Sequence, residues 1–65
     1  MKELTVREKN WIIAAVNARK TPEEAELKTE EERRYYKIIW DEAQALYDQG
    51  GVWPVFELWE LDSEV

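Results

Sequence analysis

The sequence lacks both cysteine and histidine, and the only serine among its 65 residues is Ser63. Neither a Ser/His/Asp nor a Cys/His nucleophile can be built from such a composition. The same absences exclude disulfide bonds and thiolate zinc sites. No Asp-x-Asp-x-Asp-Gly loop occurs, and Gly50-Gly51 lacks the residues of a phosphate-binding loop. We therefore expect a protein that is not an enzyme and needs no cofactor or metal ion.

Long hydrophobic runs are also missing. The longest uncharged run extends from Asn10 to Ala18, which is too short for a signal peptide or a membrane span. The lack of cysteine agrees with a reducing compartment. We therefore expect a soluble, cytoplasmic protein with no membrane partner.

Positive charge is absent from the second half of the chain. Residues 1–37 hold all nine Lys and Arg residues against eight Glu, whereas residues 38–65 hold seven acidic residues and no basic one. The net charge of -6 is thus concentrated in the C-terminal half. A field of one sign attracts basic surfaces and repels phosphates. Direct binding to nucleic acid is not expected, because the basic residues of the first half alternate with glutamates.

Three Thr-x-x-Glu motifs predict helix starts, at Thr5, Thr21 and Thr29. In each motif the Thr hydroxyl and the Glu carboxylate can satisfy free backbone N–H groups at the start of a helix. We expect helices from about Val6 to Arg19, from Pro22 to about Leu27, and from Glu30 to about Gln49. The second is short enough to be only a turn that leads into the third. Gly50 is expected to end the third helix in a left-handed conformation.

The segment from Val52 to Leu61 could be a strand by its aromatic and branched residues, but a strand would place glutamates on both faces. A short fourth helix starting at Pro54 is therefore predicted. If the segment is instead an extended arm, it has no second strand to pair with and would join the sheet of a partner. The predicted fold is all-α, a single domain of residues 1–65 with three to four helices and a long central helix.

Apolar surface exceeds what one-sided packing needs. On the third helix, apolar side chains cover an arc of about 220°, against the stripe of about 100° of an ordinary surface helix. We expect Trp11, Trp40 and Ile39 in the core. Because a chain this short buries only about 60% of its unfolded surface, association with another chain is expected to add stability.

Two functions fit these patterns. The first is a protein-binding protein, an inhibitor or a nucleic-acid mimic, which docks on a basic surface of another protein. The second is a structural component that forms a homodimer or larger homo-oligomer through its aromatic stripes. The candidate binding residues combine the C-terminal acids with aromatic residues that are enriched at interfaces; they are Asp41, Glu42, Asp48, Trp53, Phe56, Glu57, Trp59 and Glu60.

Overall fold

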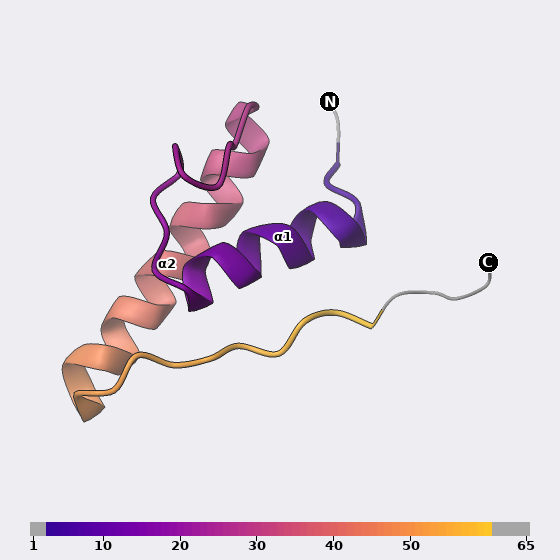
Figure 1. Cartoon of the computed structure of the whole chain (residues 1–65). Coiled ribbons are helices and arrows are strands. Elements are labelled where there is room, and N and C mark those ends of the chain that lie inside the picture. Colours follow the sequence, from indigo (N-terminus) through magenta and orange to yellow (C-terminus); the bar gives the residue numbers. More distant parts are fainter. Residues whose placement is uncertain (1–2, 61–65) are drawn as a thin grey trace.

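Two packed α-helices and an extended segment make up the computed structural model, which describes residues 3–60 (Figure 1). Helix α1 spans Val6–Asn17 and helix α2 spans Glu30–Gly50. The segment 52–60, hereafter the arm, follows α2 and runs back alongside α1. No strand occurs among the described residues. The all-α class is confirmed, but the prediction of three to four helices is wrong.

Helix α1 begins with the predicted capping box. The Thr5 hydroxyl accepts a hydrogen bond from the Glu8 N–H, and the Glu8 carboxylate accepts one from the Thr5 N–H. The helix ends two residues before the expected Arg19, which adopts the left-handed conformation with φ 59°. The N–H groups of Arg19 and Lys20 turn back to the carbonyls of Val16 and Ala15 and close a Schellman motif.

The predicted second helix is a single turn. The capping box of Thr21 and Glu24 is present, with both hydrogen bonds formed. Glu26 then adopts φ 58°, and the N–H of Leu27 bonds to the carbonyl of Pro22, so the chain reverses after one turn. The capping box is thus formed at Thr21, but no helix follows it, because the motif carries no information on how far the turn continues.

Helix α2 begins at the predicted residue and is capped by Thr29 and Glu32. Gly50 is its last residue, and the left-handed residue is Gly51, with φ 75°. The prediction that Gly50 takes this role is wrong by one position. Either glycine could accept a positive φ, so the sequence did not distinguish them.

The core lies where α1, the 18–29 loop and α2 meet. Its buried side chains are Ile12, Ala15, Val16, Ala25, Leu27, Tyr36 and Ala43. Alanine at several of these positions lets the backbones approach closely, but it leaves Ile12 and Val16 as the largest fully buried side chains. Trp40 and Ile39, predicted to be core residues, are partly buried and pack against this cluster from outside it.

Tyr36 connects α2 to the end of α1. Its hydroxyl donates a 2.6 Å hydrogen bond to the carbonyl of Lys20. Burial raises the pKa of this phenol above its ordinary value, and the charges of Glu23 and Glu24 add to the rise. The protonated phenol is therefore the form that the folded state holds.

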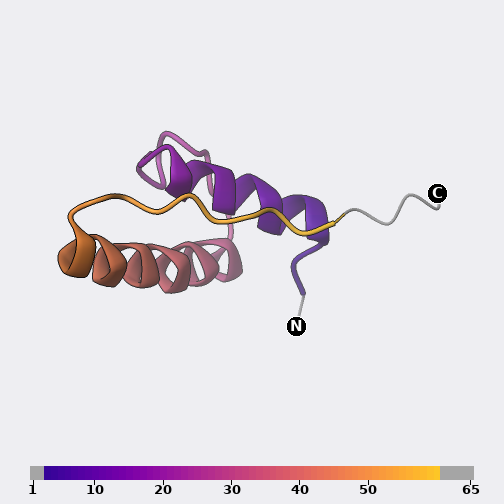
Figure 2. The ribbon, with the colours of Figure 1, turned by 90° about the horizontal axis from the view of Figure 1, so that it is seen from below.

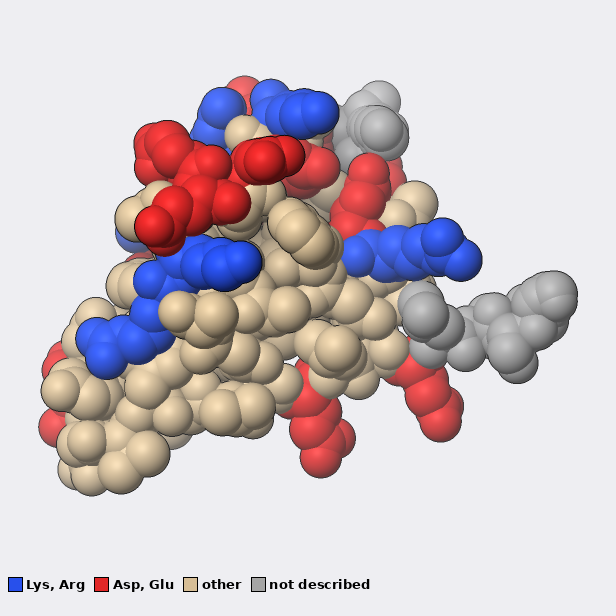
Figure 3. All heavy atoms as spheres, in the orientation of Figure 1, with Lys and Arg blue, Asp and Glu red and all other residues tan. Residues whose placement is uncertain are grey.

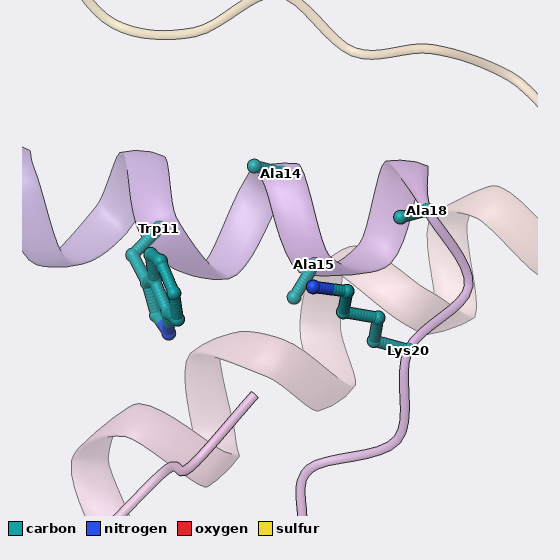
Figure 4. Close-up of a pocket in the computed structure, with 5 residues that line it drawn as sticks. All are labelled: Trp11, Ala14, Ala15, Ala18 and Lys20. Carbon is teal, nitrogen blue, oxygen red and sulfur yellow. The ribbon is translucent and has the colours of Figure 1, made fainter. Parts of the chain in front are cut away.

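Trp11 is not a core residue, contrary to the prediction. Its side chain is 56% exposed, and its indole N–H donates a 2.7 Å hydrogen bond to the carbonyl of Ala25. Figure 4 shows the indole extending from α1 on the side away from the arm, beside a hollow of about 70 Å³. Trp11 therefore holds the 18–29 loop from outside, and its apolar ring remains largely in water.

Candidate protein-binding surface

The arm is neither the predicted fourth helix nor a paired strand. It is extended, and Figures 1 and 2 both show it beside α1, on the side where the two helices meet. The extended conformation lets every third residue reach the helices, as its contacts show.

Two asparagines of α1 bind the main chain of the arm. The Asn17 side-chain amide donates to the Phe56 carbonyl at 2.9 Å and accepts from the Phe56 N–H at 2.9 Å. Asn10 makes the same pair of bonds to Trp59, at 3.0 and 2.7 Å. Each asparagine thus acts as a peptide group would in a β-ladder, and it satisfies both polar atoms of one arm residue.

The spacing of these pairs matches the two kinds of backbone. Asn10 and Asn17 are seven residues apart, which places them on one face of α1 and separates them by about 10.5 Å along its axis. Phe56 and Trp59 are three residues apart, and three extended residues span about 9 to 10 Å. Two turns of α1 therefore separate the two side-chain amides by about the same distance as three residues of the extended arm.

Trp53 inserts between the ends of both helices. Its indole N–H donates a 2.8 Å hydrogen bond to the Val16 carbonyl. Its ring lies 4.8 Å from that of Trp40 and 5.9 Å from that of Tyr47. The Arg19 guanidinium lies 4.4 Å from the Trp53 ring centre, in cation–π contact. This residue is the main anchor of the arm.

Phe56 and Trp59 continue the inward row of side chains. Phe56 is half-buried against the core cluster. Trp59 is 52% exposed, and its indole N–H donates a 3.1 Å hydrogen bond to the Tyr35 hydroxyl. The Lys9 ammonium lies 5.0 Å from a Trp59 ring centre. The contacts of the arm therefore become looser from Trp53 towards Trp59.

The outward side of the arm carries an apolar row. Val52, Val55 and Leu58 are 73%, 78% and 53% exposed. Glu57 and Glu60 are exposed beside them. In Figure 3 the region of the arm and the C-terminal end of α2 is mostly uncharged, with acidic side chains projecting below it and basic side chains bordering it above. This outward face is a compact apolar strip with acidic residues next to it.

The predicted binding residues fall into separate places. Trp53, Phe56 and Trp59 face the helices, and Glu57 and Glu60 face solvent. On α2, Asp41 pairs with Lys37 at 3.3 Å, Asp48 accepts a hydrogen bond from Gln44, and Glu42 is exposed. Among the described residues, no hydrogen bond or ion pair joins these α2 carboxylates to the arm. A binding role for all eight residues stays a prediction.

Asn10, Asn17, Lys9 and Arg19 are the residues of this surface that the sequence reading missed. A signal for them exists in the arm, where residues 52–60 read as three triplets of an aliphatic residue, an aromatic residue and a proline or glutamate. A period of three indicates an extended chain with three residues per turn. In such a chain every third side chain points the same way, so one row of side chains can pack on a neighbouring surface. The two asparagines seven residues apart are the complementary signal on α1.

Other kinds of site find little support in the part of the chain that the structure describes. No group of three or more acidic residues is placed to hold a metal ion among residues 3–60. Neither α1 nor α2 is long and apolar enough to cross a membrane. The hollow beside Trp11 holds about 70 Å³, and the two larger hollows, of about 280 Å³ beside Tyr36 and Trp40 and about 390 Å³ beside Leu4 and Tyr35, are more open to solvent. Small-molecule sites are clefts of about 300 Å³ or more that bury most of the ligand.

Comparison with known proteins adds no functional assignment. No protein-family model, curated protein or solved structure matches this chain.

Proposed function

We propose that the chain is a protein-binding protein, which presents the outward face of its arm to a basic surface of a target protein. The observation that carries this proposal is the exposed row of Val52, Val55 and Leu58 beside Glu57 and Glu60. An apolar strip next to charged residues is the composition of an interface with a dry centre and a polar rim.

The docking of the arm on α1 supports this role. An extended segment that is free in solution loses conformational entropy when it binds, and this loss reduces its affinity. Here the pairs made by Asn10 and Asn17 already hold the arm extended. The arm has therefore already lost this conformational entropy when the protein folds, and binding to the target does not have to order it again.

Charge supports the choice of partner. The chain has no basic residue after Lys37, and the only charged residues of the arm are Glu57 and Glu60. A basic target surface would be attracted over a Debye length of about 8 Å at physiological ionic strength. Inhibition of a nucleic-acid-binding protein is the finer form of the proposal, because such proteins have basic surfaces.

Affinity capture from the source cells tests the proposal. We expect the double variant Val55→Ser and Leu58→Ser to lose the captured target, because both side chains contact it directly. Ile38→Ser is the matched control, since Ile38 is 64% exposed but lies on α2. Capture of the same proteins by all three forms would contradict the proposal. Substitution of Trp53 would be less informative, because it would also release the arm from the helices.

Two further measurements refine the assignment. Added salt should weaken the complex, as it does for docking driven by charge. Competition by duplex DNA for the same target would support the nucleic-acid mimic, and indifference to DNA would exclude it.

Self-assembly is the second candidate function. It is favoured by Trp11 and Ile38, two large apolar side chains that lie exposed away from the arm. Light scattering of the purified protein separates the candidates, because a monomer at high micromolar concentration would contradict assembly through these surfaces.

A further inference from the structure

One side of α1 binds the main chain of an extended segment, the arm. In the structure this arm belongs to the same chain. We propose that this side of α1 also accepts the arm of a second copy, so that two chains exchange arms and form a dimer. The proposal concerns the inward face of the arm and does not depend on the proposed function of the outward face.

The contacts that hold the arm are of a kind that another copy can supply. Four hydrogen bonds join the Asn10 and Asn17 amides to the main chain at Phe56 and Trp59. The Trp53 indole adds a bond to the Val16 carbonyl. All of these partners lie within α1 and the arm. An arm arriving from a second chain would therefore meet the same donors and acceptors at the same spacing.

The connection between α2 and the arm is the element that decides between the two arrangements. Gly51 has φ 75°, and this conformation directs the arm back over its own chain. Its N–H bonds to the Tyr47 carbonyl. If Gly51 adopts a negative φ instead, the arm leaves its own α1, and exchange with a second copy restores every contact. At low concentration the attached arm is favoured, because its effective concentration is high.

The test is the Gly51→Pro variant of the full chain. Proline fixes φ near -65° and cannot adopt the positive value of Gly51, so the arm cannot return to its own α1. We expect light scattering to give a mass twice that of the 7.8 kDa chain at concentrations where the unsubstituted protein is monomeric. Gly50→Ala is the matched control, because Gly50 is helical and has open space around it; it should behave as the unsubstituted protein does.

The exchanged contacts are tested by Asn10→Leu and Asn17→Leu added to Gly51→Pro. We expect this triple variant to be monomeric, because leucine has similar size but cannot pair with the arm. A Gly51→Pro chain that keeps its helical circular dichroism and stays monomeric would overturn the proposal. A dimer that survives both leucine substitutions would overturn it as well, since other surfaces would then hold it.

A second measurement works even if the proline variant does not fold. A fluorescent synthetic peptide of residues 52–60 is titrated with the Trp53→Ala variant of the full chain, and binding is followed by anisotropy. In this variant the attached arm has lost the indole bond to Val16 and competes less for α1. N-methylation at the positions of Phe56 and Trp59 removes the N–H groups that donate hydrogen bonds to the asparagine side chains. We expect it to weaken binding about tenfold or more. N-methylation at the positions of Val55 and Leu58, whose N–H groups have no partner among the described residues, is the control. Equal binding of the two methylated peptides, or no saturable binding of the unmodified peptide, would overturn the proposal.

Discussion

Asn17 and Asn10 make the same pair of bonds to the arm in different surroundings. The Asn17 bonds are partly buried, whereas those of Asn10 are exposed to water. Replacement by aspartate keeps the acceptor oxygen but puts a carboxylate oxygen opposite the arm carbonyl. We expect Asn17→Asp to lower the free energy of unfolding by about 2 kcal/mol, and Asn10→Asp by about 1 kcal/mol or less, because water replaces an exposed partner. Urea denaturation of both variants measures the difference, and equal losses would contradict it.

Tyr36 gives the fold a dependence on alkaline pH. Its pKa is raised by burial and by Glu23 and Glu24, so the folded state holds the phenol proton more tightly than the unfolded state does. The contribution to stability is complete below the unfolded pKa of about 10 and is lost as pH rises through the folded pKa. We expect Tyr36→Phe to cost about 1 kcal/mol at neutral pH, through loss of the bond to Lys20. The variant should also lose less stability between pH 9 and 11, and parallel curves would contradict the assignment.

Among the elements, the turn at 21–27 contains a residue with a strained backbone conformation. Glu26 is exposed and has φ 58°, a conformation that costs a residue with a Cβ about 1 kcal/mol or more. Glu26→Gly should therefore raise the free energy of unfolding by about 0.5 to 1 kcal/mol. Thermal denaturation measures this gain.

Arg19→Gly is the control for that substitution. Arg19 has nearly the same φ, 59°, but its guanidinium contacts the rings of Trp53 and Tyr47. The same relief of strain is then offset by lost cation–π contacts, each worth about 0.5 to 1 kcal/mol at an exposed site. We expect a smaller gain or a net loss. A larger gain than that of Glu26→Gly would show that these contacts contribute nothing.

Helix starts were the most predictable part of the fold, because the capping box is a local motif whose partners are three residues apart. The starts at Thr5 and Thr29 were correct, whereas the capping box at Thr21 formed but begins only a single turn. Helix ends were less predictable. Arg19 and Glu26 end their turns in a conformation that their sequence does not favour, so tertiary contacts decide it.

The candidate site was predictable only in part. Composition identified the C-terminal acids and aromatics, but it could not separate inward from outward residues without the period of three. Asn10 and Asn17 were missed because asparagine inside a helix is usually neutral or mildly unfavourable. Their function depends on arm residues that lie 49 and 39 positions further along the chain. Trp11 was misplaced because its role is a hydrogen bond to Ala25, which no helical pattern encodes.

At the scale of the whole molecule, the arm and the helix pair are two layers of unequal stability. Ala43 is fully buried between the helices, whereas the arm leaves its aliphatic row in water. A small core makes global unfolding cost little, and opening of the arm should cost less still. The molecule is therefore expected to pass through a state in which the helices stay packed while the arm is free.

Hydrogen exchange detects this state residue by residue. Within the arm, we expect slow exchange only at the amides of Phe56 and Trp59, because their N–H groups are bonded to asparagines, and fast exchange at Val55 and Leu58. The Phe56 amide should exchange through arm opening, with a low free energy and a weak dependence on urea. The Ala43 amide should exchange through global unfolding, with a higher free energy and the full urea slope.

Asn17→Leu should remove the protection of Phe56 and lower that of Ala43 only by its effect on global stability. Identical free energies and slopes at Phe56 and Ala43 would mean that the arm and the helices unfold as one unit, and arm opening without global unfolding would then be excluded.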